Sequence, residues 1–266
     1  MFKEKKYKNI IIYKMGRSIG KFTLYPVHSF LVNDIIIDTG TPYTEKEFLT
    51  AVKKKKISAI INTHYHEDHI GNNSAIQKKH NAKIYAHKDS IPFISTPEKN
   101  RLRFYQKFVW KLPDKSNAIP IANNVETDDF NLKVIEAKGH SKGSIYLYEK
   151  NKKWLFTGDM FCGIKNIYLR SDENFNEILK SLEMISELEI DTVFCGLKGV
   201  IPHGNIVIKR KIVFMKDLQK RTMDLFNKGF SPKKIKRKLL GFEDIMFYIS
   251  TGHFSKQNLI NSIIKR

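Results

Sequence analysis

The sequence lacks the features that mark secreted, disulfide-bonded or membrane-spanning proteins. It has only 2 cysteines, Cys162 and Cys195, which are too few for a disulfide framework. No apolar run reaches the length of about 18 residues that a membrane-spanning helix needs. The charged N-terminus is followed only by the short apolar run 10–13, which is unlike a signal peptide. We therefore expect no membrane span, and we predict a cytoplasmic location.

Acidic residues are scarce relative to basic ones. The chain has 47 Lys and Arg against 27 Asp and Glu, a net charge of +20. From Asn205 to the end there are 15 basic and 4 acidic residues, and such an excess attracts polyanions. Nucleic acid is therefore one predicted partner. The Lys-, Asn- and Ile-rich composition of a biased genome explains the same excess equally well.

The arrangement of apolar residues changes near residue 204. Before it, short β-branched and aromatic runs alternate with charged segments of helical pattern, which is typical of mixed α/β folds. After it, residues 205–228 predict one long helix and shorter helices follow, separated by glycines. We predict a main domain over residues 1–204 and a basic helical C-terminal extension over residues 205–266. Residues 90–124 are interrupted by prolines. Within them, residues 101–112 are predicted to form a helix with an apolar face and to border a substrate cleft.

A cluster of metal-binding residue types follows the apolar strand predicted at residues 57–62. His64, His66, Asp68 and His69 lie within six positions. His64 and His66 are two residues apart, so in extended backbone their side chains project to one side. Asp68 and His69 fall where the chain turns into the next helix. Imidazole nitrogen and carboxylate oxygen are ligands that zinc favours, so the sequence predicts a metal site here.

Three further motifs occur in order around this cluster. They are Asp38-Thr39-Gly40, Gly139-His140-Ser141 and Thr157-Gly158-Asp159. Together with the His-x-His-x-Asp-His pattern they resemble the metallo-β-lactamase superfamily, over residues 10–204. The resemblance implies a mixed α/β fold, a four-layer αββα sandwich with the metal site at one edge of its two sheets.

The resemblance also implies roles for individual residues. His64, His66 and His140 would form a first metal site, Asp68 and His69 would belong to a second, and Asp159 would bridge them. The implied cofactor is zinc, as one or two ions, with iron or manganese as alternatives. Asp68 would orient a water or carry its proton. Asp38 would brace the ligands from behind.

One position departs from the family pattern. Members usually carry a last histidine ligand after the final strand, and here Leu197 stands in its place. His203, six residues later, is the predicted substitute. Without a substitute, the second site would lack a ligand, and it would either bind its ion weakly or leave the enzyme with one metal. His253 is interpreted as a helix-start residue, with a position at the cleft as the alternative. His28 is interpreted as a packed or hydrogen-bonded residue. Cys162 is interpreted as a buried structural thiol, with a position near the metal site as the alternative.

The predicted function is metal-dependent hydrolysis of a small-molecule ester, thioester, lactone or phosphoester. One alternative is a mononuclear iron oxygenase resembling persulfide dioxygenases, whose ligands match His64, His140 and Asp159. A second is a nucleic-acid-processing or nucleic-acid-binding protein that uses the basic C-terminal extension. A non-catalytic family member is disfavoured because six ligand positions are intact. The sequence carries no signal for an oligomeric state.

Overall fold

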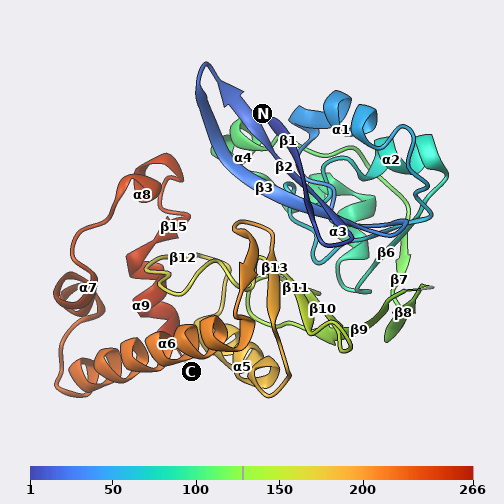
Figure 1. Cartoon of the computed structure of the whole chain (residues 1–266). Helices are drawn as coiled ribbons and strands as arrows, with labels where there is room; N and C mark the ends of the chain where they lie inside the picture. The colour runs from blue at the N-terminus through green and yellow to red at the C-terminus, as the bar shows by residue number, and fades with distance from the viewer. Residues whose placement is uncertain (128, 266) are drawn as a thin grey trace.

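Runs of β-branched and aromatic residues build two sheets that pack face to face in this computed structural model, which describes residues 1–127 and 129–265 (Figure 1). The first sheet has the strand order β1 to β7, antiparallel from β1 to β4 and parallel from β4 to β7. Its strands are β1 (Phe2–Tyr7), β2 (Ile10–Ile19), β3 (Phe22–Val32), β4 (Ile35–Ile37), β5 (Ala59–Ile61), β6 (Lys83–Ala86) and β7 (Ala118–Pro120).

The second sheet has the strand order β14-β13-β11-β10-β9-β8, and only the β11–β13 pair is parallel. Its strands are β8 (Asn124–Glu126), β9 (Asn131–Glu136), β10 (Ile145–Glu149), β11 (Trp154–Gly158), β13 (Thr192–Cys195) and β14 (Gly199–Pro202). A short antiparallel pair, β12 (Leu169–Arg170) with β15 (Phe254–Ser255), joins the C-terminal region to the main body.

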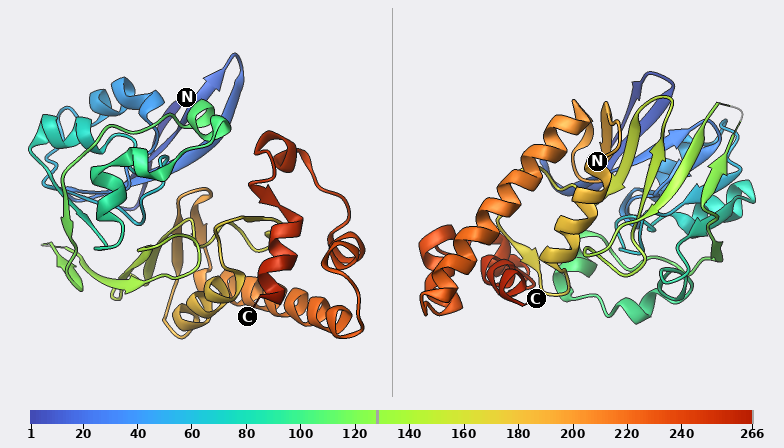
Figure 2. Two further views of the ribbon diagram at one scale, coloured as in Figure 1. Left: turned by 180° about the vertical axis from the view of Figure 1, so that it is seen from behind. Right: turned by 90° about the horizontal axis from the view of Figure 1, so that it is seen from below.

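Helices cover the outer faces of both sheets (Figure 2). The helices are α1 (Glu45–Ala51), α2 (Asn73–His80), α3 (Ile91–Ser95), α4 (Phe104–Val109), α5 (Phe175–Ser186), α6 (Gly204–Asn227), α7 (Pro232–Leu240), α8 (Ile245–Ile249) and α9 (Lys256–Ile264), with 3-10 turns at Pro42–Thr44 and Pro97–Asn100. The predicted αββα sandwich is therefore confirmed. No helix among the described residues is long and apolar enough to cross a membrane.

The core between the two sheets is aromatic. Phe30 of the first sheet meets Phe156 and Phe194 of the second, with ring centroids 5.6 and 5.4 Å away. All three side chains are buried, and burying one phenylalanine contributes about 1.5–3 kcal/mol. This packing holds the sheets together at the edge where the metal-binding residue types gather.

The C-terminal helices share a core with the second sheet. Ile208 and Leu218 of α6 and Leu259 and Ile263 of α9 belong to the same buried cluster as the apolar face of α5. The helix predicted at residues 205–228 is confirmed as α6. The division of the chain at residue 204 stays a prediction, because these helices pack directly on the main body.

Candidate metal centre

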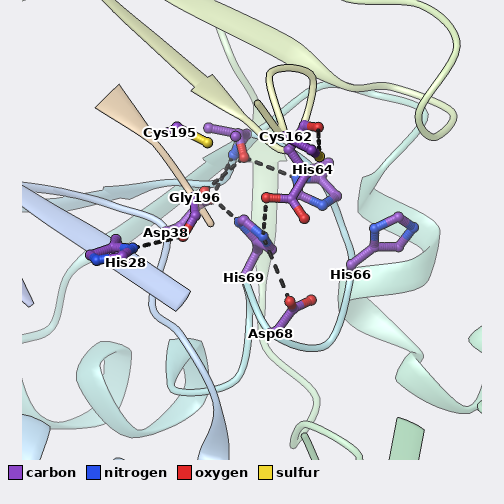
Figure 3. Close-up of polar contacts among 12 residues, drawn as sticks. His28, Asp38, His64, His66, Asp68, His69, Cys162, Cys195 and Gly196 are labelled. Carbon is purple, nitrogen blue, oxygen red and sulfur yellow. Dashed lines mark hydrogen bonds and ion pairs between the residues drawn. The ribbon is translucent and has the colours of Figure 1, made fainter. Parts of the chain in front are cut away.

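The site forms where several strands of both sheets end at the same edge. Asp38 follows β4, the segment Thr63–His69 follows β5, Asp159 follows β11 and Gly196 follows β13. His140 comes from the loop between β9 and β10. Because the parallel strands run in one direction, their carboxyl ends bring these loops together, as Figure 3 shows for most of the residues.

Three histidine nitrogens converge in the first cluster. The Nε2 atom of His140 lies 3.0 Å from Nδ1 of His66 and 3.3 Å from Nε2 of His64. The ligand atoms of these residues, which we call the three-histidine set, lie within 4.8 Å of one another. Burial, together with positive charge on neighbouring groups, lowers the pKa of His64 and His66 well below the usual value. Both rings are therefore neutral and their lone pairs are available to a cation.

The outer nitrogen of two of these rings is held by a hydrogen bond. Nδ1 of His140 donates to Glu173 Oε1 at 2.5 Å. Thr63 Oγ1 donates to Asp38 and accepts from Nδ1 of His64 at 3.0 Å. These bonds leave Nε2 of His64 and of His140 facing the cluster, which is how outer partners orient metal-binding histidines.

A second cluster contains two carboxylates and one histidine. His69 Nε2 lies 3.3 Å from Asp159 Oδ1 and 3.9 Å from Asp68 Oδ2. We call Asp68, His69 and Asp159 the acidic set. Burial alone would lower the pKa of His69, but the carboxylates of Asp159, Asp38 and Asp68 raise it well above the usual value. Burial raises the pKa of Asp68 to about 7, although the charge of His69 opposes that shift.

Asp38 connects the two sets from behind. Its carboxylate accepts hydrogen bonds from the backbone N–H of Thr63 at 2.8 Å, from Thr63 Oγ1 at 2.7 Å and from His69 Nδ1 at 2.7 Å. The backbone of Asp38 is left-handed, with φ of 56°, which costs roughly 1 kcal/mol or more for a residue that is not glycine. The three bonds offset that strain and fix the direction of His69.

The donor atoms fit a divalent ion. Nε2 of His69 and Oδ1 of Asp159 are buried and make no hydrogen bond within the described part of the chain. Buried polar atoms without a partner cost about 1–3 kcal/mol each, and a bound cation would satisfy both. Imidazole nitrogens with carboxylate oxygens form the kind of ligand set that zinc takes.

The turn after β13 lies against the acidic set. A Cβ atom added at Gly196 would lie 2.6 Å from Asp159 Oδ1 and from His69 Cε1. The next residue, Leu197, lines the cavity beside the site. An apolar side chain therefore stands next to the acidic set, where it supplies no ligand.

His203 does not reach the site. Pro202 pairs with Thr192, whereas the site lies at the other end of β13, where Cys195 pairs with Gly199. His203 itself is exposed and precedes α6 in a left-handed conformation, with φ of 58°. This placement corrects the expectation that His203 replaces the missing histidine, because a whole strand length separates it from the acidic set.

A cavity of about 540 Å³ opens over the two sets. His66, Asp68, His140 and Asp159 lie at its floor, and the aromatic rings of its wall come from Tyr25, Trp110, Tyr168 and Phe254. Its cationic lining residues are Lys14, Lys165, Arg170 and Lys198. The cavity thus combines a polar floor with an aromatic and basic wall.

Two smaller predictions concern residues beside the site. His28 Nδ1 donates to the carbonyl oxygen of Gly196 at 3.1 Å, so His28 is hydrogen-bonded as predicted (Figure 3). Cys162 Sγ donates to the carbonyl oxygen of Asp159 at 2.7 Å, and burial raises the pKa of its thiol well above the usual value. His28 therefore supports the turn after β13, and Cys162 supports the loop that carries Asp159.

The sequence reasoning missed Arg170 and misjudged His253. Arg170 Nη1 lies 3.2 Å from Nδ1 of His66. His253 is buried, hydrogen-bonds Tyr105 and faces Asp172, so its interpretation as a mere helix-start residue is wrong. Ser255 caps α9 instead. The sequence signal near Arg170 is only a short charged run, Arg170-Ser171-Asp172-Glu173.

Comparison with known proteins agrees with this geometry. The profile of the metallo-beta-lactamase superfamily matches residues 23–197, and the chain belongs to this superfamily. The chain is 26% identical over 162 residues to a hydroxyacylglutathione hydrolase of Bdellovibrio bacteriovorus, covering 60% of this chain and 57% of that protein. It is 27% identical over 190 residues to the probable metallo-hydrolase YybB of Bacillus subtilis, covering 65% and 81%.

The fold is shared along nearly the whole chain with a solved structure. A beta-lactamase domain protein from Burkholderia ambifaria aligns with a TM-score of 0.71 at 13% identity, covering 98% of this chain and 87% of that one. At this identity the likeness shows the fold alone. It includes the C-terminal helices as well as the sandwich.

Proposed function

We propose that this protein is a metal-dependent hydrolase of small-molecule esters or thioesters, with its principal ion at the three-histidine set. The observation that carries the proposal is the convergence of His64, His66 and His140 at 3.0 and 3.3 Å between facing nitrogens. Superfamily membership supports hydrolysis. A divalent ion bound there, zinc by preference of the ligands, would polarise a substrate oxygen and lower the pKa of a water molecule.

The chain's own residues then perform positioning and proton transfer. Asp68 lines the same cavity as His66 and His140, where it can orient a water and accept its proton. Asp159 and His69 provide further ligand atoms in the acidic set. The aromatic wall of the cavity can hold the apolar part of a substrate against the floor.

The relatives support the ester or thioester class. The name of the Bdellovibrio bacteriovorus protein specifies hydrolysis of an acylated glutathione, a thioester. The chain spans 57% of that protein's length at 26% identity, so the thioester assignment is our proposal rather than a transfer of identity. Lactones and phosphoesters are the next classes to test.

The oxygenase alternative requires a different grouping of ligands. It needs His64, His140 and Asp159 around one iron. In the described residues the ligand atoms group His64 with His66 and His140, and also with Asp38 and His69, whereas Asp159 groups only with Asp68 and His69. This arrangement favours the hydrolase. Oxygen uptake with a persulfide substrate by the iron-loaded protein would support the oxygenase instead.

The nucleic-acid alternative is weakened by how the basic C-terminal residues are used. Lys211 is buried and donates to the carbonyl oxygen of Gly163 at 2.9 Å. Lys216 pairs with Glu183 at 2.7 Å. Part of the positive charge therefore holds α6 on the main body rather than facing a phosphate backbone.

The test is hydrolysis of a panel of esters, thioesters, lactones and phosphoesters by protein loaded with zinc, iron or manganese. We expect zinc-dependent cleavage of an ester or thioester, abolished in a His64→Ala, His140→Ala double variant. His203→Ala is the matched control, because His203 is exposed and remote from the site. No hydrolysis of any class with any of the three metals would overturn the proposal.

A further inference from the structure

Arg170 places a cation in the wall of the cavity. Its side chain is 11% exposed. Nε donates to Asp172 Oδ1 at 3.0 Å and Nη2 to Asp172 Oδ2 at 2.8 Å, a bidentate pair. This pairing leaves Nη1 directed at His66, 3.2 Å from Nδ1, the nitrogen that faces the three-histidine set.

The C-terminal segment fixes this direction. Arg170 lies on β12, and its backbone pairs with Phe254 of β15. The backbone N–H of Ser171 donates to the carbonyl oxygen of His253 at 2.9 Å. Residues 253–255 therefore hold the backbone on both sides of Arg170.

Side-chain contacts also connect the C-terminal segment to the surroundings of Arg170. His253 Nε2 lies 3.5 Å from Asp172 Oδ1, and His253 Nδ1 hydrogen-bonds the hydroxyl of Tyr105 at 2.6 Å. On the other side, the Arg170 backbone N–H donates to Glu173 Oε2 at 2.7 Å, and Glu173 Oε1 accepts from His140. Helix α4, the C-terminal segment and a residue of the three-histidine set thus meet around one guanidinium group.

Outside the two ligand sets, four basic residues and two acidic residues, Glu67 and Glu173, line the cavity. Glu67 accepts from Gln106 at 2.9 Å, and Glu173 accepts from His140 and the Arg170 backbone. In the described part of the chain, none of the cavity-lining lysines forms an ion pair; they are Lys14, Lys165 and Lys198. Outside the two ligand sets, the cavity therefore favours an anion.

We propose that Arg170 is a catalytic residue that binds an oxyanionic group of the substrate at the three-histidine set, and that the C-terminal segment aims it there. The group is a carboxylate or phosphate oxygen next to the bond that is cut. Guanidinium suits such oxygens because it is always charged and presents planar, paired donors. The substrate class rests on the proposed hydrolase function, whereas the anion site does not.

A purely structural role explains less of the geometry. If Arg170 only tied Asp172 to the main body, its two bonds to that carboxylate would suffice, and Nη1 could face any polar neighbour. Instead Nη1 lies beside a nitrogen of the three-histidine set, in a wall shared with three lysines. A metal ion at the three-histidine set would repel this guanidinium group, and placing a cation there favours a role in binding negative charge.

The test measures binding of inorganic phosphate and of acetate to the full chain by calorimetry, with and without bound zinc. For Arg170→Gln we expect about 10- to 100-fold weaker anion binding in both states, since charge-assisted bonds contribute about 1.5–3 kcal/mol. Zinc content should stay unchanged. Arg170→Lys should retain part of the affinity. The tighter of the two anions identifies the substrate group.

Arg221→Gln is the matched control, because Arg221 also pairs with an aspartate but its side chain, on α6, is exposed. Anion affinity equal to wild type in folded Arg170→Gln protein would overturn the proposal. If the protein hydrolyses a substrate but Arg170→Gln binds anions as tightly as wild type, the role of Arg170 is rejected and the proposed function stands. Arg170-dependent anion binding without any hydrolysis would instead reject the proposed function and leave the anion site standing.

His253 and Tyr105 are tested as positioning residues. His253→Ala should weaken phosphate binding about fivefold, the equivalent of roughly 1 kcal/mol, at unchanged zinc content. His253→Gln, which can keep a hydrogen bond to Tyr105 or Asp172, should recover most of that affinity. Equal phosphate affinity in His253→Ala and wild type would show that the C-terminal segment does not aim Arg170.

Discussion

The two ligand sets at the sheet edge differ in completeness. The three-histidine set has three buried rings that converge, and outer hydrogen bonds orient two of them. The acidic set has one histidine and two carboxylates, and the apolar Leu197 lines the cavity beside it without supplying a ligand. We therefore expect the three-histidine set to hold an ion by itself. The second set depends on what its three residues supply.

The largest effect should come from dismantling the three-histidine set. His64→Ala with His140→Ala removes two of three facing nitrogens, and we expect loss of the tight ion and an activity drop of about 1000-fold or more. Metal analysis and steady-state kinetics measure both. Retention of a tight ion in this variant would show that the acidic set, not the three-histidine set, binds metal more tightly.

Asp68→Asn tests the acidic set without touching the first. A carboxamide keeps the shape but cannot accept a proton, so kcat should fall by about 100- to 10000-fold. Metal at the three-histidine set should remain. An unchanged kcat would exclude Asp68 as the residue that moves the proton.

Leu197→His should make the acidic set a better metal site, closer to the three-histidine set. The side chain lines the cavity beside the acidic set, and an imidazole there would add the ligand that the set lacks. We expect metal content to rise from about one ion toward two per chain, measured by elemental analysis after dialysis. Leu197→Met, similar in volume, is the control that should leave the content unchanged.

Asp38→Asn tests what the two sets share. The carboxylate orients Thr63 and His69 through three hydrogen bonds, and loss of such outer partners weakens metal affinity about 10- to 100-fold. Competition with a chromogenic chelator measures this affinity. An effect confined to one ion would show that Asp38 serves one set rather than both.

The smallest effect should lie outside both sets, at Asp172. Burial alone would raise its pKa, but His253 and Arg170 lower the pKa well below the usual value. A lowered pKa stabilises the fold above the ordinary carboxyl pKa of about 4, and this stabilisation is lost as the pH falls below it. Because the Asp172 side chain is 52% exposed, we expect the ionised carboxylate to contribute less than about 1 kcal/mol to the free energy of unfolding. Urea unfolding of wild type and Asp172→Asn from pH 6 to 3 measures this contribution. The same change of unfolding free energy with pH in both proteins would contradict the prediction.

The sandwich and the ligand residues could be predicted because their signals are local. His64, His66, Asp68 and His69 lie within six positions after one apolar strand, and a strand end is where ligand loops meet. The long helix α6 follows from an uninterrupted helical pattern. Such features depend on near neighbours in the sequence.

Arg170 and His253 could not be predicted in the same way. They meet because β12 pairs with β15 across more than 80 positions of sequence, and two-residue strands leave no periodic pattern. Strand β1 was also missed, since its central residues 3–6 are all charged and exposed, which hides the alternation of a strand. The position of His203 could not be predicted because β14 pairs antiparallel with β13 and carries the chain away from the site, and no local pattern specifies this pairing.

The most direct test of the comparison is the number of tightly bound metal ions per chain. The protein is purified without added metal, loaded with zinc, dialysed and analysed for metal and protein together. Our account predicts one tight equivalent that disappears when His64 and His140 are replaced and that survives replacement of Asp68. Two equally tight ions, or one that survives the loss of both histidines, would contradict it.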